Sequence, residues 1–389
     1  MRIDIANSEM FSTIFESMLG SKIYHPIAGL TNDSRQVEGG DLYIAIKGKN
    51  NDGHEFLDEA KEKGAVAALV NEINNDFDLQ QIKVKDTIES IKSVAIKWRQ
   101  NFDIPIVAIT GSNGKTSSKD LLVHILSENF EVHATKGNFN TTIGLCFTLF
   151  GLQPHHDLAI VEIGASMPGE IKNLCSIALP THGLITNIAP AHLEGFGSIE
   201  NIAREKGDLF RALNDGISFV NMADDHISKI NIKGEKISFG LTPDCNFPAD
   251  IFQEEDGTLT LILNTHEIKT NSHNFSFLKN CIAASAIAIT LGVKAETLNN
   301  QLRSFSPPKG RCFVSQKNNI TIIDDTYNAN LTSAFAALDY LNAFSNEGRK
   351  IFVFGDMLEL GDESEKQHAQ IGMKCSNLEI DCVFTIGDQ

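Results

Sequence analysis

The chain is organised around one glycine-containing turn that follows an apolar run and precedes a helical pattern. Residues 104–109 are continuously apolar, which is typical of a buried strand, and apolar residues recur at helical spacing between Leu122 and Phe130. A glycine turn between a strand and a helix N-terminus favours phosphate, because backbone N–H groups and the helix dipole face the anion. The predicted nucleotide-binding residues are Gly111, Ser112, Asn113, Gly114, Lys115 and Thr116.

The turn departs from the strict phosphate-loop pattern, because Ile109 stands where a glycine is expected, five residues before Gly114. A bare Gly-Lys-Thr also occurs by chance, so the alternative is a tight turn with a solvated lysine. The flanking strand and helix favour a nucleotide. Lys115 would then add a point charge, and the Thr116 hydroxyl could bind magnesium.

Composition limits the classes of partner. The 389 residues carry a formal charge of −17, which argues against a general nucleic-acid or anionic-membrane binder. The seven cysteines form no close pair, and the first 20 residues lack the pattern of a secretory signal. Residues 281–293 form an apolar run that is too short to cross a bilayer. We therefore expect a cytoplasmic protein with reduced thiols.

The length suggests two or three domains, and the pattern of elements favours three α/β units. Residues 1–84 predict a small unit with strands at 42–46 and 65–70 and a helix at 56–63. Its polar turns would by themselves be ordinary surface loops. Residues 85–306 form a central domain that begins with a helix after Asp86, contains short strands between 217 and 272, and ends in a helix at 280–292.

Pro307-Pro308 marks the start of a third unit, residues 307–389. Strands at 320–324, 351–355 and 382–386 alternate with helices at 332–344 and 364–375, which predicts a second parallel, Rossmann-like sheet. The sequence stops directly after the last strand, where a crossover helix is expected. We therefore expect this third domain to be incomplete, with a naturally short domain as the alternative.

Two strands of the central domain end in polar residues. Residues 158–164 read as a strand with one carboxylate, Glu162, and residues 184–188 as a strand that leads to His192. Ligands bind beyond the carboxyl ends of parallel strands. Glu162 either has a structural partner or faces magnesium, and His192 is either a hydrogen-bonded loop histidine or a ligand of nucleotide or metal.

A lysine interrupts the apolar face of the next helix, residues 198–213. Helical counting places Lys206 inside the apolar stripe, opposite the face that carries Arg204, Glu205 and Asp208. Such a lysine either snorkels to solvent or has a lowered pKa. A neutral amine can add carbon dioxide and become a carbamate, which binds metal. Helical spacing leaves both interpretations open.

Taken together, these motifs resemble the Mur ligase family of peptidoglycan synthesis. The resemblance extends through all three predicted domains and includes the missing first glycine of the phosphate loop. One difference is Ser276-Phe277, where the family usually carries His-Asn, and another is Leu331 in place of a proline. The matching segments are 110–116, 135–138, 162–170, 187–197, 203–207, 309–311, 324–330 and 355–361.

The resemblance implies ATP and two magnesium ions as cofactors and a role for each matching residue. Lys115 and the loop amides would bind the β- and γ-phosphates, with Thr116 and Glu162 on one magnesium. His192 and a carbamylated Lys206 would hold the second. The remaining implied contacts are Arg311 and Asp325 with nucleotide phosphate and ribose, Ser34, Arg35 and Lys47 with the UDP part of the substrate, and Asn138 with the substrate and phosphate region.

Residues 355–360 favour one branch of this family. Its members add D-alanyl-D-alanine to UDP-N-acetylmuramoyl-tripeptide through an acyl phosphate, and the resemblance implies that activity in a cytoplasmic monomer. The alternatives are a family member that adds the third amino acid, which typically carries a Gly-Gly-Asp-Arg-Asp-like segment here, a nucleotide-switch protein, and a non-catalytic nucleotide-binding protein.

Overall fold

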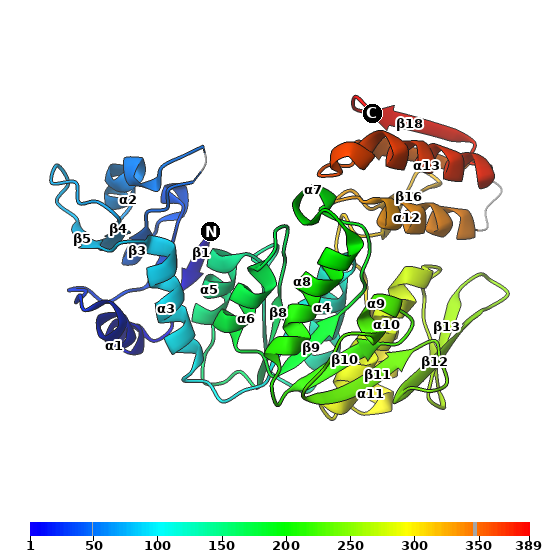
Figure 1. Ribbon diagram of the computed structural model, residues 1–389, viewed down its shortest axis with the longest axis horizontal. Coiled ribbons are helices and arrows are strands. Elements are labelled where there is room, and N and C mark those ends of the chain that lie inside the picture. The colour runs from blue at the N-terminus through cyan, green and yellow to red at the C-terminus, as the bar shows by residue number, and fades with distance from the viewer. Residues whose placement is uncertain (49, 345–347) are drawn as a thin grey trace. The chain divides into compact units, whose positions relative to one another are not determined.

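The computed structural model describes residues 1–48, 50–344 and 348–389. These residues form two compact units (Figure 1). The first unit contains Met1–Val107, Glu131–Ile163 and Asn173–Pro180, and the second contains Ala108–Phe130, Gly164–Lys172 and Thr181–Gln389. Within the described ranges, no helix is both long and apolar enough to span a membrane.

The first unit begins with a five-stranded sheet in the order β1 to β5. Only β1 is antiparallel to its neighbour, and the other pairs are parallel. β3 and β4 are buried at every position, as expected for parallel strands covered on both faces. The elements are β1 (Arg2–Asp4), α1 (Ser8–Leu19), β2 (Gly29–Thr31), β3 (Asp41–Ile44), α2 (Leu57–Glu62), β4 (Ala67–Val70) and β5 (Gln80–Lys83).

Three helices of the first unit share an aromatic core. α3 (Thr87–Arg99) begins where predicted, because the Asp86 side chain caps it by accepting from the N–H groups of Ile88 and Glu89. Trp98 of α3 lies 6.3 Å from Phe11 of α1 and 6.1 Å from Phe150 of α5 (Thr142–Phe150), measured between ring centroids. This core joins the N-terminal part to the start of the central sheet.

The central sheet is built on β6 (Ile106–Thr110), which both units share. In the first unit, β7 (Val132–Ala134) pairs in parallel with β8 (Leu158–Glu162), and Ala159 N donates to Pro105 O, 2.9 Å away. In the second unit, Thr186 N, just beyond β9 (His182–Ile185), donates to Thr110 O at 2.9 Å. The carboxyl ends of β6 and β9 therefore meet at one edge.

The second unit continues this sheet from β9 to β14. Strands β9 to β12 are parallel, and β12 to β14 form an antiparallel meander. The prediction of short strands between 217 and 272 is confirmed. These strands are β10 (Ile217–Asn221), β11 (Glu235–Gly240), β12 (Phe247–Gln253), β13 (Leu259–Leu263) and β14 (His266–Lys269).

Several helices accompany these strands. α10 starts earlier than the predicted residue 280, because Asn274 caps it by accepting from Phe277 N. The helices are α4 (Lys115–Leu126), α6 (Glu170–Ala178), α7 (Leu193–Phe196), α8 (Ile199–Ala212), α9 (Asp225–Ser228), α10 (Phe275–Thr290) and α11 (Ala295–Ser304).

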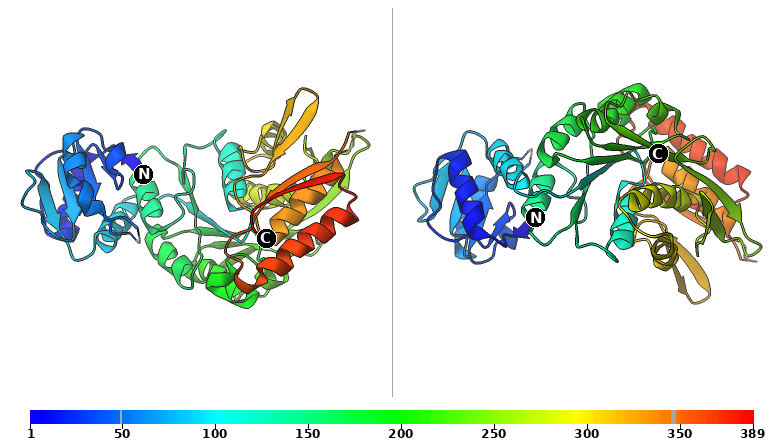
Figure 2. Two further views of the ribbon diagram at one scale, coloured as in Figure 1. Left: turned by 90° about the horizontal axis from the view of Figure 1, so that it is seen from above. Right: turned by 90° about the horizontal axis from the view of Figure 1, so that it is seen from below.

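The C-terminal part of the second unit contains the predicted parallel strands and helices. β17 (Ile351–Gly355) pairs in parallel with β18 (Cys382–Ile386). Next to them, α12 (Leu331–Ala343) and α13 (Ser364–Asn377) run side by side (Figure 2). Their shared core contains Leu338, Met357, Leu360 and Ile371.

One strand of this part differs from the prediction. β16 (Ile320–Asp324) pairs antiparallel with β15 (Phe313–Lys317) in a separate two-stranded sheet. Asn318 and Asn319 connect the strands, and both have positive φ, 50° and 62°. Two such residues favour a tight hairpin turn, because their backbone twist matches that of the paired strands.

Candidate active site

The phosphate-loop glycines stand where neighbouring side chains leave no room for a Cβ atom. Gly114, with φ of 79°, precedes α4 and has no side chain that could cap the helix. A Cβ at Gly111 would lie 1.9 Å from Thr186 Oγ1, and one at Gly114 would lie 2.9 Å from Asn280 Oδ1. The N–H groups at the start of α4 therefore face a site bounded by small residues, which suits an anion.

The segment after β9 holds the loop in shape. Asn113 N donates to Asn187 Oδ1 at 2.9 Å, and Ser112 N donates to Asn187 O at 3.0 Å. The Ser112 hydroxyl donates to Ala189 O at 2.7 Å, and the Thr186 hydroxyl donates to Asn113 O. Thr186 and Asn187 thus form part of the site, although no sequence pattern assigned them a role.

Two cations lie at this loop. Lys115 Nζ donates to Gly111 O at 2.8 Å, and Arg311 Nη2 donates to Thr116 Oγ1 at 3.0 Å. The Arg311 guanidinium stacks on the Tyr327 ring, 4.0 Å from its centroid. Lys115 and Arg311 were predicted as nucleotide ligands from different domains, and the fold brings both to the same loop.

An asparagine that was not predicted also reaches the loop. Asn330 Nδ2 donates to Asn113 Oδ1 at 2.6 Å, and Asn113 Nδ2 donates back to Asn330 Oδ1 at 3.3 Å. Asn330 simultaneously caps α12, because its Oδ1 accepts from Ser333 N at 3.0 Å. Its capping role could have been read from the sequence, but its long-range partner could not.

Lys206 is fully enclosed, so the snorkelling interpretation is wrong. Its helix α8 begins where Ser198 accepts from Asn201 N, as predicted, and only 2% of Lys206 is exposed. Burial, and then the nearby charge of Lys115, lower the pKa of the Lys206 amine to about 7, whereas Glu205 opposes this shift. The site thus contains an amine that is substantially neutral at physiological pH.

The prediction that Glu205 lies on the polar face of α8 is wrong. Glu205 is 4% exposed, and its two carboxylate oxygens accept from Gly169 N and Ile171 N, both at 2.7 Å. These N–H groups lie at the start of α6, where the helix dipole favours a carboxylate. Helical periodicity could not show this partner, because it belongs to a distant segment.

His192 lies in the turn before α7 in a left-handed conformation, with φ of 52°. Its Nδ1 is hydrogen-bonded to Glu359 Oε2, and 30% of its side chain is exposed. In the part of the chain that the structure describes, no three His, Cys, Asp or Glu residues cluster as a metal site. A second magnesium held by His192 and Lys206 therefore stays a prediction.

Glu162 ends β8 in the first unit and is 2% exposed, so the prediction of a buried carboxylate is confirmed. Its Oε1 accepts from Asn140 Nδ2 at 3.0 Å. Asn138, the predicted substrate residue, is exposed, and the nearby Asn140 is the amide that reaches Glu162. A magnesium shared by Glu162 and Thr116 stays a prediction, because these residues belong to different units.

The predicted UDP-binding residues lie after neighbouring strands of the first sheet. Ser34 and Arg35 follow β2, and Lys47 follows β3, which is parallel to β2. The side chains of Arg35 and Lys47 are 79% and 78% exposed, with Arg35 2.9 Å from Asp33 and Lys47 3.7 Å from Asp52. Carboxyl ends of adjacent parallel strands lie at one edge, so these residues can face a common ligand.

Asp325, the predicted ribose ligand, is engaged with its own segment. Its Oδ1 accepts from Cys312 N at 3.0 Å, and burial raises the pKa of its carboxyl group. The charge of Arg311 opposes this rise in the pKa of Asp325. Its contact with ribose stays a prediction.

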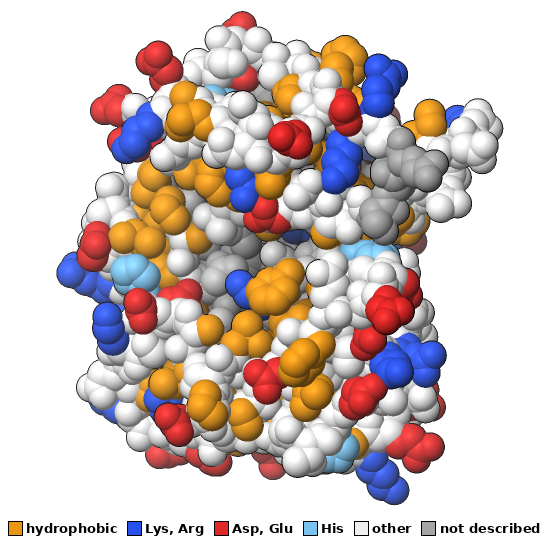
Figure 3. Space-filling model, turned by 90° about the vertical axis from the view of Figure 1, so that its right-hand side faces the viewer, with side chains coloured by type: hydrophobic (Ala, Val, Ile, Leu, Met, Phe, Trp, Pro, Cys, Tyr) orange, Lys and Arg blue, Asp and Glu red, His pale blue; other side chains and the backbone are white. Residues whose placement is uncertain are grey.

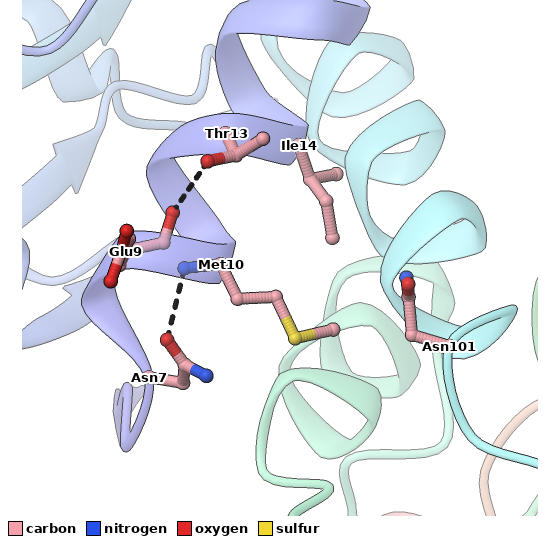
Figure 4. Close-up of a pocket in the computed structure, with 6 residues that line it drawn as sticks. All are labelled: Asn7, Glu9, Met10, Thr13, Ile14 and Asn101. Atoms are coloured by element: carbon pink, nitrogen blue, oxygen red, sulfur yellow. Dashed lines mark hydrogen bonds between the residues drawn. The ribbon is translucent and has the colours of Figure 1, made fainter.

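A surface hollow of about 350 Å³ lies in the first unit, between α1 and Asn101, two residues after the end of α3 (Figure 4). Its polar groups are used locally: Asn7 caps α1 by accepting from Met10 N, and Thr13 donates to Glu9 O. The hollow therefore has no feature of a catalytic site. It is lined by Asn7, Glu9, Met10, Thr13, Ile14 and Asn101.

The molecular face shown in Figure 3 carries acidic and basic side chains interspersed, without a large patch of one sign. Binding of an anion to this acidic chain must therefore depend on local groups, such as Lys115, Arg311 and the N–H groups of α4. A parallel sheet with a glycine turn, a helix N-terminus and converging cations defines the class of α/β nucleotide-dependent enzymes.

Family comparisons specify this class further. Residues 26–107 match the Mur ligase family catalytic domain, residues 109–288 the Mur ligase middle domain, and residues 310–389 the Mur ligase glutamate ligase domain. The chain belongs to the Mur ligase family.

Individual relatives agree with this assignment. The UDP-N-acetylmuramoyl-tripeptide–D-alanyl-D-alanine ligase of Escherichia coli K12 is 35% identical over 100% of this chain and 87% of its own length. The ligase of the same name from Bacillus subtilis 168 is 32% identical over 93% of this chain and 80% of its own length.

Solved structures give the same fold. MurF from Acinetobacter baumannii superimposes with a TM-score of 0.88 at 30% identity, covering 97% of this chain and 85% of that one. MurF ligase from Thermotoga maritima, solved in complex with ADP, has a TM-score of 0.82 at 28% identity, covering 92% and 83%. The prediction of a three-domain α/β Mur ligase fold is confirmed.

Proposed function

We propose that this chain is an ATP-dependent ligase that adds D-alanyl-D-alanine to UDP-N-acetylmuramoyl-tripeptide, as the names of its relatives indicate for those proteins. The observation that carries the proposal is the enclosed amine of Lys206, with a pKa near 7, beside Lys115 of the phosphate loop. Desolvation of this kind favours the neutral, nucleophilic form of an amine, and strongly shifted pKa values concentrate at functional sites.

The reaction has two steps. The γ-phosphoryl group of ATP passes to a carboxylate oxygen of the tripeptide, giving an acyl phosphate and ADP. The dipeptide amine then attacks the carbonyl carbon, loses a proton, and phosphate leaves as the amide forms. A carboxylate would have to expel oxide, which is prohibitive, so activation is essential. Lys115 and Arg311 offset the repulsion between carboxylate and triphosphate.

We propose two magnesium sites for this reaction. Thr116 and Glu162 would hold one ion, and His192 with a carbamylated Lys206 would hold the other. The neutral amine of Lys206 would add carbon dioxide and release a proton, which would turn an uncharged side chain into a carbamate anion near the charge of Lys115. Bound magnesium would neutralise charge on the transferring phosphoryl group and on the carboxylate.

The remaining residues would orient the substrates. Ser34, Arg35 and Lys47 would bind the UDP part, with two well-exposed cations available for its phosphates. Asn138 would contact the substrate, and Asp325 the ribose of ATP. The substrate-binding, ATP-binding and C-terminal domains would comprise residues 1–84, 85–306 and 307–389. We place the enzyme in the cytoplasm as a monomer that closes by a hinge around its substrates.

Phosphate release measured over a panel of UDP-muramoyl peptides and dipeptides tests this proposal. We expect release that requires both UDP-muramoyl-tripeptide and D-alanyl-D-alanine, in stoichiometric amount with the new amide. Phosphate release that requires UDP-muramoyl-dipeptide and a single amino acid would indicate the family member that adds the third amino acid of the peptide. Hydrolysis that is indifferent to both substrates would instead identify a nucleotide switch.

A further inference from the structure

Two segments that are 167 residues apart in the sequence meet at His192. Glu359 lies between β17 and the short helix η3 (Gly361–Glu363), and its Oε2 is hydrogen-bonded to His192 Nδ1. Its main chain is also engaged, because Glu194 N donates to Glu359 O at 3.4 Å. Figure 1 shows α7 beside the C-terminal elements, in agreement with these contacts. One side-chain and one main-chain hydrogen bond therefore hold Glu359 beside His192 and Glu194.

Both partners hold a backbone conformation that side chains disfavour. His192 has φ of 52° and Glu359 has φ of 61°, in the left-handed region that suits glycine. Non-glycine residues keep such a conformation where surrounding interactions determine it, and such residues concentrate at functional sites. Both side chains are themselves partly exposed, 30% for His192 and 56% for Glu359, so their contact alone would contribute little to stability. The backbone of each residue is therefore arranged so that the two side chains meet.

The contact determines which nitrogen of His192 carries hydrogen. A carboxylate accepts hydrogen bonds, so a neutral imidazole must keep its hydrogen on Nδ1 when Nδ1 faces Glu359. Nε2 then retains its lone pair and can accept a proton or bind a cation. Without Glu359, both tautomers become available to the ring.

We propose that Glu359 is a positioning residue that keeps His192 in the Nδ1–H tautomer. This rests on the proposed function, in which His192 would be a ligand of the second magnesium. Ligand histidines generally donate their other ring N–H to a carboxylate or a carbonyl. Because Glu359 belongs to the C-terminal domain and His192 to the central one, the tautomer is fixed only while these two parts of the second unit are in contact.

Nitrogen NMR of histidine-labelled protein, free of metal and nucleotide, tests the tautomer directly. The His192→Gln variant identifies the His192 signals among those of the twelve histidines. We expect the Nδ1–H form in the unmodified protein and a shift toward Nε2–H in Glu359→Ala. The control is Glu363→Ala, which removes a nearby exposed carboxylate that pairs with Lys366 at 2.7 Å and should leave the signals unchanged. An unchanged tautomer in Glu359→Ala overturns the proposal.

Kinetics provide the second readout. We expect Glu359→Ala to lower kcat by about 10- to 100-fold and to raise the magnesium requirement, with little change in KM for ATP. Glu359→Gln should lose less, because its amide oxygen can still accept from Nδ1–H. Full kcat in Glu359→Ala, or equal losses in both variants, contradicts the proposal. Absence of substrate-dependent phosphate release in the unmodified protein would instead refute the proposed function, which the NMR measurement does not require.

Discussion

The phosphate loop and helix α8 each present a lysine to the same region, and the protein treats the two lysines in opposite ways. Lys115 is partly exposed, and its ammonium donates to the carbonyl oxygens of Gly111 and Ser112, at 2.8 and 3.4 Å. Lys206 is 2% exposed, and its pKa falls to about 7. Carbonyl oxygens replace water around the first amine, whereas burial removes water from the second without full replacement.

This difference shows how one residue type can serve two kinds of chemistry. An ammonium that retains polar partners is suited to bind phosphate as a cation. A desolvated amine is suited to lose its proton and form a covalent bond. The mutual repulsion of Lys115 and Lys206 strengthens this division, because the charge on Lys115 contributes to the lowered pKa of Lys206.

The largest expected effect is that of removing the enclosed amine. Lys206→Ala should lower kcat by about 10³-fold or more, because the proposed carbamate and the ion that it would hold would both be lost. Short carboxylic acids should partly restore turnover, since a carboxylate can occupy the vacated space. Acetamide is the matched control, because it has a similar size without the charge. Full activity of Lys206→Ala, or rescue by acetamide to the same degree, would refute the carbamate.

Replacing Lys115 should lower kcat less than replacing Lys206 does, and for a different reason. Lys115→Ala should lower kcat by about 10²- to 10³-fold, because a cation that stabilises the transferring phosphoryl group is lost. Carboxylic acids should not restore it, since the missing charge is positive. Steady-state phosphate release with and without acetate checks this. Rescue of Lys115→Ala by acetate would show that the two lysines are not functionally distinct.

The smallest effect concerns stability. Between pH 7 and about 10.5 the unfolded chain keeps a proton on Lys206 that the folded protein releases, so stability should rise with pH across this window. The slope is at most about 1.4 kcal/mol per pH unit for one proton. Urea unfolding in CO₂-free buffer at several pH values should show it in the unmodified protein. Lys206→Met should lack it, and equal slopes in both proteins would contradict the shifted pKa.

Much of the fold could be predicted because its elements obey local rules. Asp86 and Ser198 cap α3 and α8, and the apolar stripe correctly included Lys206, although it left open whether this lysine is enclosed or snorkels. Helix α1 was not predicted, although Asn7 as its cap and the buried Phe11 at the next helical turn were visible signals. Parallel pairing of β17 with β18 followed from strand and helix alternation.

What could not be predicted depended on partners distant in sequence. Glu205 was assigned to solvent because its acceptor role requires the N–H groups of Gly169 and Ile171. Asn330 and Glu359 lay in segments that resembled the family, but no local pattern connects them to Asn113 and His192. Periodicity reports which face of an element is buried, and it contains no information on what that face meets.

Asn330 makes hydrogen bonds both within its own helix and with Asn113 of the phosphate loop. Because Asn330 caps its own helix, its rotamer is set before it encounters Asn113. Side chains that are already ordered lose little entropy when they dock, so each renewed encounter of the C-terminal part with the loop is inexpensive in free energy. In the hinge closure that we propose, the C-terminal part would return to the same alignment with the loop in every cycle.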